Sequence, residues 1–189
     1  MGGTFNPVHY GHLINAEYIK DEFSLDKILF IPSKIPVHKN LECGISASDR
    51  YSMLERALSS NSGFEISGVE VDREEPSYTY LTVEQLRSEL PGSELYLIIG
   101  LDSYNEFDTW KEYERLSQMV SIIVMRRSGG FMKRENIPGA EGDFLFSSNP
   151  IIEISSSCIR ERIRANQSVR YMVPEVVIEY INKYGLYLK

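Results

Sequence analysis

Short β-rich apolar runs alternate with helical patterns along the whole chain, and this alternation constrains the fold more than any other feature. The predicted strands cover residues 27–31, 64–71, 94–100, 120–126 and 151–154. The predicted helices cover residues 11–23, 48–59, 80–90, 156–165 and 174–184, with a short irregular helical region at 102–118. The strands are mostly continuous apolar runs, as in strands buried on both faces. We therefore predict an α/β fold, a Rossmann-like, doubly wound parallel sheet covered by helices on both sides.

Length and composition predict one globular domain, residues 1–189. The chain is 42% hydrophobic and long enough to bury a substantial core. Its apolar runs fall short of the roughly 20 residues that cross a bilayer, and its first residues do not resemble a signal peptide. Two cysteines are too few to indicate a disulfide framework. We expect a cytoplasmic protein with no membrane partner.

The charge distribution favours small anionic ligands over nucleic acid. The formal net charge is −7, which argues against a nucleic-acid partner. Basic residues nevertheless gather in a loop that begins at Arg126 and Arg127, and on a helix that carries Arg160, Arg162 and Arg164. A solvated loop and an ordinary surface helix are the alternative interpretation of these two groups.

The first dozen residues are typical of a phosphate site. His9 and His12 frame Gly11 directly behind a Gly-Gly-Thr-Phe turn, and a helical pattern begins there. Apolar residues follow His12 at helical spacing, which places His12 in the first turn on the inward face. Backbone amides of a first turn lack partners within the helix and attract anions, and glycines let a phosphate approach closely. Two imidazoles can then donate hydrogen bonds to phosphate oxygens.

Two other interpretations of these histidines stay open. A single histidine on a helix face is most often a structural residue. A zinc site could use His9, His12 and His38 as ligands, although no cysteine or carboxylate is suitably spaced to complete it.

A second anion site is predicted near the C-terminus. Three serines, residues 155–157, precede a helix on which Arg160 and Arg164 stand four residues apart. Hydroxyl groups, free amides and a guanidinium one turn into the helix together suit phosphate oxygens. A simple serine N-cap is the alternative.

These motifs together resemble the nucleotidyltransferase superfamily that carries a His-x-Gly-His signature. The Gly-Gly-Thr-Phe-Asn-Pro segment before His9 looks most like that of its bacterial nicotinate mononucleotide adenylyltransferases. Further landmarks occur in the family's order, and the resemblance spans nearly the whole chain. They are Phe30-Ile31-Pro32, Pro36-Val37-His38-Lys39, Pro76-Ser77-Tyr78-Thr79, Ile99-Gly100-Leu101-Asp102-Ser103 with Trp110, and Ile154 to Arg160.

The resemblance implies transfer of the adenylyl group of ATP to nicotinate mononucleotide, with Mg²⁺ brought by the nucleotide and no metal held by the protein. The implied catalytic residues are His9, His12 and Arg160. The implied ATP-binding residues are Gly3, Thr4, Phe5, Gly11, Lys39, Gly100, Asp102, Ser156 and Ser157. The implied nicotinate mononucleotide-binding residues are Tyr78, Thr79, Tyr80 and Trp110. On sequence alone, Trp110 is equally suited to core packing and Asp102 to a helix cap.

Three other functions remain. They are adenylyl transfer to phosphopantetheine, preference for nicotinamide mononucleotide, and a nucleotide-binding module without turnover. The sequence leaves a homo-oligomer open, and the Gly-rich, charged loop 127–143 is long enough to close over the site.

The start of the chain departs from the family pattern. A central first strand should precede the Gly-Gly-Thr-Phe turn, so this strand is predicted to be truncated. Either Met1 is an internal methionine of a longer product, which we favour, or the sheet lacks its middle. We expect weaker folding and a less firmly held phosphate turn from this sequence.

Overall fold

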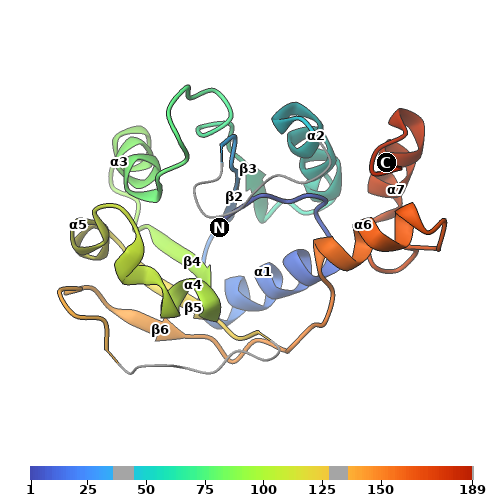
Figure 1. Cartoon of the computed structure of the whole chain (residues 1–189). Helices are drawn as coiled ribbons and strands as arrows, with labels where there is room; N and C mark the ends of the chain where they lie inside the picture. The colour runs from blue at the N-terminus through green and yellow to red at the C-terminus, as the bar shows by residue number, and fades with distance from the viewer. Residues whose placement is uncertain (36–44, 128–135, 189) are drawn as a thin grey trace.

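We describe a computed structural model of the protein, in which residues 1–35, 45–127 and 136–188 are placed well enough to describe. Helices and strands alternate along the chain as the sequence predicts (Figure 1). The strands are β1 (Gly2–Gly3), β2 (Ile28–Pro32), β3 (Phe64–Ile66), β4 (Tyr96–Gly100), β5 (Ser121–Met125) and β6 (Phe144–Phe146). The helices are α1 (Tyr10–Glu22), α2 (Ala47–Leu58), α3 (Thr79–Glu89), α4 (Leu101–Asn105), the 3-10 turn η2 (Phe107–Thr109), α5 (Tyr113–Met119), α6 (Ser156–Arg164) and α7 (Glu175–Tyr184).

All strand pairs in the described residues are parallel, which confirms the predicted sheet type. They form two three-stranded sheets, ordered β1-β2-β3 and β4-β5-β6. In the second sheet, Ile122 and Ile123 are both fully buried although they point to opposite faces of β5. The sheet is therefore covered on both sides, as continuous apolar strands predict.

The first strand is short, as predicted, and the two sheets do not join along it. Gly2 pairs with Ile31 and Gly3 with Pro32 of β2, whereas no pairing between β1 and β4 occurs in the described residues. A cavity of about 870 Å³ lies between β2 and β4 and is lined by both strands. Among the described residues, this cavity therefore separates β2 from β4 next to the Gly-Gly-Thr-Phe turn.

The predicted strand at 151–154 is wrong, and the structure has β6 instead. Residues 151–154 form no strand, and Ile151 is half exposed. Buried Asn149 accepts a hydrogen bond from the Arg126 backbone N–H at 2.8 Å, and Ile154 packs against the core beside α1. Ile154 thus contributes to the core from a segment that joins no ladder. The predicted strand at 64–71 is also shorter, because the chain turns at Gly68, whose carbonyl accepts the Asp72 N–H at 2.9 Å.

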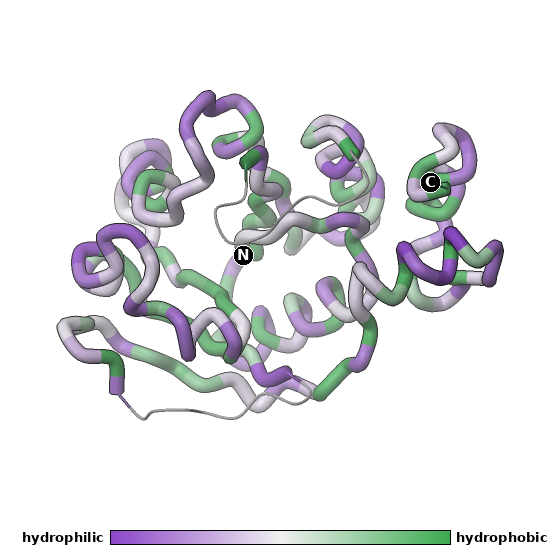
Figure 2. The backbone as a smooth tube through the Cα atoms, in the orientation of Figure 1, coloured by the Kyte–Doolittle hydropathy of each residue, from purple (hydrophilic) through white to green (hydrophobic). Residues whose placement is uncertain are grey.

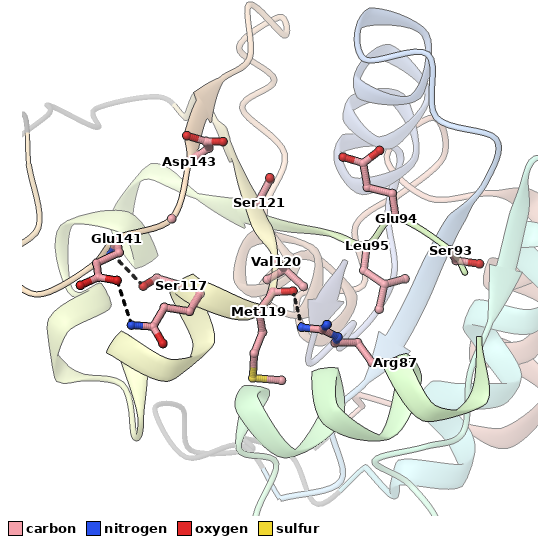
Figure 3. A pocket seen from close by; sticks show the side chains of 12 residues that line it. Arg87, Ser93, Glu94, Leu95, Ser117, Met119, Val120, Ser121, Glu141 and Asp143 are labelled. Atoms are coloured by element: carbon pink, nitrogen blue, oxygen red, sulfur yellow. Dashed lines mark hydrogen bonds between the residues drawn. The ribbon is translucent and has the colours of Figure 1, made fainter. Parts of the chain in front are cut away.

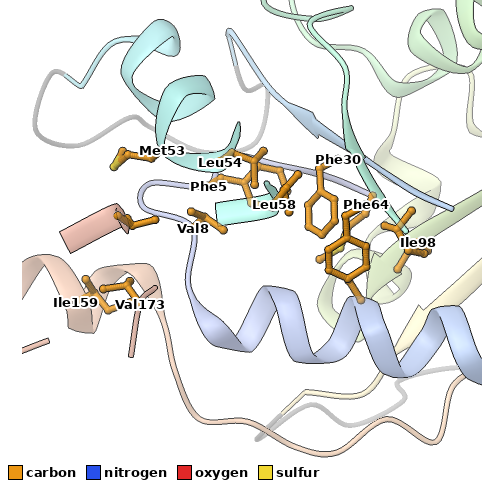
Figure 4. Close-up of a cluster of buried hydrophobic side chains, with 14 of the residues drawn as sticks. Phe5, Val8, Phe30, Met53, Leu54, Leu58, Phe64, Ile98, Ile159 and Val173 are labelled. Carbon is orange, nitrogen blue, oxygen red and sulfur yellow. The ribbon is translucent and has the colours of Figure 1, made fainter. Parts of the chain in front are cut away.

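The segment from the Gly-Gly-Thr-Phe turn to His9, residues 2–9, is called the phosphate turn below. It is anchored in the main hydrophobic core. Figure 4 shows Phe5 and Val8 of the turn among side chains from β2, β3 and α2. The Phe5 ring lies 5.8 Å from that of Phe30, which in turn meets Phe64 at 5.1 Å. Hydrophobic residues follow the strands and the inner sides of the helices (Figure 2). A rigid core therefore holds the turn from one side.

In the described part of the chain, no helix combines the length and apolar character needed to cross a membrane.

Candidate active site

Helix α1 begins where the sequence predicts, and its first turn holds both histidines. His9 is the N-cap residue, and its backbone N–H donates to His12 Nδ1 at 3.3 Å. Because Nδ1 accepts this bond, the neutral His12 ring carries its proton on Nε2. Phe5 meets the His12 ring edge-on at 5.1 Å. His12 is thus fixed in one tautomer and one orientation.

The two imidazoles are stacked, with 3.7 Å between their centroids. A Cβ at Gly11 would lie 3.0 Å from His9 Nδ1, so glycine leaves the room for this arrangement. His9 is 4% exposed, and burial, aided by the charge of Arg127, lowers its pKa to about 4. His9 is therefore neutral at pH 7. His12 lines the cavity, whereas His9 supports it from behind.

Helix α6 lies at the back of the same turn. The Ser156 hydroxyl donates to the Pro7 carbonyl at 2.9 Å, and Arg160 Nη1 donates to the Asn6 carbonyl at 3.0 Å. Arg160 also reaches the Ser157 hydroxyl at 3.2 Å and is only 7% exposed. The two predicted anion motifs thus meet in space, as expected. In this structure Ser156 and Arg160 hold the turn itself.

The cavity between the sheets brings several predicted residues together. Its end near the turn lies at the carboxyl ends of the parallel strands, where ligands of open α/β sheets bind. The predicted site residues that line it are Gly3, Thr4, His12, Thr79, Gly100 and Trp110. Residues assigned to ATP and to nicotinate mononucleotide therefore share one cavity, although they come from four separate segments of the sequence.

Asp102 and Arg127 form an ion pair at the mouth of this cavity. Their side-chain atoms Oδ2 and Nη1 lie 3.5 Å apart, and the side chains are 65% and 48% exposed. The Arg127 side chain passes over Gly100, where a Cβ would lie 3.3 Å from Arg127 Cδ. The sequence interpretation placed Arg127 in a basic cluster but did not assign it to the site. Its position just past the carboxyl end of β5 was the signal that could have found it.

The aromatic residues predicted to bind the pyridine ring lie on neighbouring elements. Trp110 is half-buried, with its ring 5.4 Å from that of Phe107, and it also lines the cavity. The Tyr78 and Tyr80 rings lie 6.3 Å apart at the start of α3. Neither tyrosine lines the cavity, whereas Thr79 does. Trp110 thus combines packing against Phe107 with a place in the cavity wall.

Lys39 and His38 lie outside the described residues, so the predicted phosphate contact of Lys39 and the zinc alternative with His38 stay predictions. Within the described ranges, no three His, Cys, Asp or Glu side chains converge as metal ligands would. Lys34, which precedes this segment, donates to the Arg73 carbonyl at 2.9 Å.

A smaller pocket of about 350 Å³ lies at the opposite edge of the second sheet (Figure 3). Arg87 reaches across it to the Met119 carbonyl, and Glu141 contacts Ser117 and Gln118. None of the predicted site residues lines this pocket, which adjoins the amino ends of β4 and β5. Ligands of open sheets bind at the other edge, so the chemistry is assigned to the larger cavity.

Comparison with known proteins identifies the class to which the chain belongs. The family described as cytidylyltransferase-like matches residues 1–162. The fold and the site therefore define a nucleotidyltransferase of the cytidylyltransferase-like class.

Curated relatives narrow this class. A relative from Desulfitobacterium hafniense (strain Y51), named "Probable nicotinate-nucleotide adenylyltransferase", is 40% identical over 99% of this chain and 93% of its own length. A relative of the same name from Dictyoglomus thermophilum is 41% identical over 100% of this chain and 97% of its own length. The chain belongs to the family of the nicotinate-nucleotide adenylyltransferases.

A solved structure shares the fold. The Plasmodium falciparum nicotinic acid mononucleotide adenylyltransferase complexed with NaAD superposes with a TM-score of 0.79 at 20% identity, covering 98% of this chain and 94% of that one. The likeness extends over nearly the whole of both chains, so the nucleotidyltransferase fold is shared in full.

Proposed function

We propose that this chain transfers the adenylyl group of ATP to nicotinate mononucleotide, releasing pyrophosphate and nicotinate adenine dinucleotide. One observation carries the proposal. Helix α6 holds the phosphate turn through its carbonyls, and His12 at the end of this turn lines the same cavity as Trp110. The names of the curated relatives point to the same reaction.

The reaction needs positioning more than covalent chemistry by the protein. An ionised oxygen of the 5′-phosphate of nicotinate mononucleotide attacks the α-phosphorus of ATP. The new P–O bond forms in line as the bond between the α-phosphorus and the bridging oxygen of the β-phosphate breaks. The electron pair of the broken bond leaves with pyrophosphate. Because the attacking oxygen is already ionised, the step requires no general base.

His12 and the backbone amides of the turn would together stabilise the charge that develops on the α-phosphate. Its Nε2–H is the donor of a ring that stacking and the His9 N–H hold in place. A fixed donor stabilises charge that develops on the α-phosphate without reorganising during the reaction. The stacked His9 ring sets the position of the His12 ring. Because His9 stays neutral, it does not repel a positive charge on His12. Contacts of Ser156, Ser157 and Arg160 with the leaving pyrophosphate remain predictions.

Mg²⁺ would arrive on the phosphates of ATP. The described residues offer no converging set of three metal ligands, and Mg²⁺ binds readily through phosphates, water and one or two carboxylates. When bound, the ion neutralises phosphate charge.

The test is magnesium-dependent release of pyrophosphate from ATP, with nicotinate mononucleotide, nicotinamide mononucleotide and phosphopantetheine supplied separately. We expect release with the nicotinate substrate, and loss of release when the metal is chelated. Faster release with either of the other acceptors would reassign the substrate. ATP binding without release in any of the three reactions would show a binding module.

A further inference from the structure

Arg50 is the largest fully buried side chain among the residues that the structure describes, and none of the site motifs includes it. It stands in the first turn of α2 and is 0% exposed. Its Nη1 donates to the Thr4 carbonyl at 2.7 Å. Within the described ranges, its Nε and Nη2 are buried and have no hydrogen-bond partner. Two strong donors of a permanent cation are thus held out of water next to the phosphate turn.

The protein provides no carboxylate for this cation in the part of the chain that the structure describes. The neighbouring carboxylate, Asp49, accepts hydrogen bonds from Ser46 and from the Tyr180 hydroxyl. Burial lowers the pKa of Arg50, partly offset by the nearby Tyr187, yet an arginine stays charged at neutral pH. A buried charge without a partner costs free energy of folding. A bound anion near the guanidinium would offset this cost.

The position of the guanidinium points to where that anion would bind. Three donors from other elements bond to backbone carbonyls of the turn. Ser33 N–H donates to Gly3 O at 3.0 Å, Arg50 to Thr4 O, and Arg160 to Asn6 O. In a trans peptide the N–H points opposite to the C=O. Anchoring the Thr4 carbonyl on α2 therefore directs the Phe5 N–H away from α2.

The same bond supports an unusual backbone conformation. Phe5 has a φ of 45°, a left-handed value that is uncommon for residues other than glycine. Such a conformation persists where the surroundings hold it in place. Thr4 itself lines the cavity, so an anion bound there is separated from the guanidinium by little more than one peptide group.

We propose that Arg50 is a positioning residue whose buried guanidinium holds the phosphate turn open for ATP and serves as the through-turn counter-charge of its phosphates. This inference rests on the proposed function, because it takes ATP as the anion. Arg50 makes no contact with the substrate in this scheme. It acts through the Thr4–Phe5 peptide and through its charge.

Two variants test the charge at this position. Arg50→Lys keeps the charge on a side chain one atom shorter than the guanidinium nitrogen that reaches the Thr4 carbonyl, whereas Arg50→Gln loses the charge and ends two atoms short of that nitrogen. We expect Arg50→Gln to raise the KM for ATP about tenfold, with a smaller change in kcat, and Arg50→Lys to stay within about threefold of the parent protein. Adenosine, which has no phosphates, should bind all three proteins equally.

The matched control is Arg56 on the same helix, which is exposed and lies 5.3 Å from the Tyr180 ring. Arg56→Gln and Arg56→Lys should leave both constants unchanged. Equal KM values for ATP in Arg50→Lys and Arg50→Gln would overturn the proposed role of the Arg50 charge as a counter-charge of the phosphates. A parent protein that fails to bind ATP would instead refute the proposed function.

A second measurement uses the parent protein and therefore does not depend on how the variants fold. The Nε–H of Arg50 is followed by NMR and assigned in the parent protein through its connections to the Arg50 backbone. We expect magnesium-ATP to shift this signal and to slow its exchange with solvent, whereas adenosine should do neither. The same response to both ligands, or no response to ATP, would overturn the inference.

Discussion

The imidazole rings of His9 and His12 lie face to face, 3.7 Å apart and inclined by 28°. Two cationic rings at this distance would repel each other strongly, so the arrangement requires at least one neutral ring. The burial of His9 makes it the neutral one, since its pKa is lowered to about 4, first by desolvation and then by Arg127. The relationship between the two rings thus determines how the site responds to pH.

The first prediction concerns stability between pH 6.5 and pH 4. In the unfolded chain His9 has an ordinary pKa near 6.5. As pH falls below this value, His9 binds a proton in the unfolded state but stays unprotonated in the folded state. The free energy of unfolding should therefore fall as pH drops through this window, by up to about 3 kcal/mol from this residue, and be unaffected by it above pH 6.5.

Chemical denaturation at several pH values, on the parent protein and on His9→Gln, measures this contribution. The difference between the two proteins isolates His9 from other titrating groups. In the folded parent protein, NMR titration of the ring should give a pKa well below 6.5. An ordinary pKa in that titration would refute the account of the stacked pair.

A second prediction concerns His12→Ala. Loss of one preorganised donor to the reacting phosphate should lower kcat on the order of 10² to 10³-fold. The measurement is pyrophosphate release at saturating substrates. Tyr18→Phe on the outer face of α1, where the hydroxyl meets Ser148 at 2.9 Å, is the control and should keep parent turnover. Near-parent turnover in His12→Ala would remove His12 from the mechanism.

A third prediction uses Trp110, the single tryptophan of the chain. Its half-buried ring lines the cavity, so stacking on the pyridine ring should quench its fluorescence as nicotinate mononucleotide is added. Trp110→Ala should raise the KM for nicotinate mononucleotide roughly tenfold while changing the KM for ATP little, and Trp110→Phe should recover part of the loss. Equal effects on both substrates would indicate a packing role.

Much of this architecture could be predicted because it depends on local pattern. The inward face of α1 follows from helical spacing, and it placed His12 correctly in the first turn. Continuous apolar runs predicted parallel strands covered on both faces, as Ile122 and Ile123 show. The same rule failed at 151–154, where the segment forms no strand and Ile151 is half exposed, because a short apolar run does not by itself indicate strand pairing.

Other features depend on contacts that sequence spacing does not reveal. Arg50 is separated from Thr4 by 46 positions, and nothing in the sequence around it marks it as different from Arg56. The contact of Arg160 with pyrophosphate stays a prediction, but nothing in the sequence indicates that its guanidinium also donates to the Asn6 carbonyl. Such assignments require the direction of a side chain and the burial of its charge, which appear only when distant segments are brought together.

The last prediction tests Arg127 at the mouth of the cavity. Its pair with Asp102 is well exposed on both sides, so Arg127→Met should change the free energy of unfolding by less than about 1 kcal/mol. Its charge is the second cause of the low pKa of His9, after burial, so the variant should raise that pKa while leaving it below 6.5.

Because a cation at the cavity mouth attracts anionic substrates, the KM of Arg127→Met for ATP or nicotinate mononucleotide should rise severalfold, and more at low ionic strength than at high. Arg126→Met is the matched control, since Arg126 precedes Arg127 and does not line the cavity. Unchanged KM values together with an unchanged His9 pKa would place Arg127 outside the site.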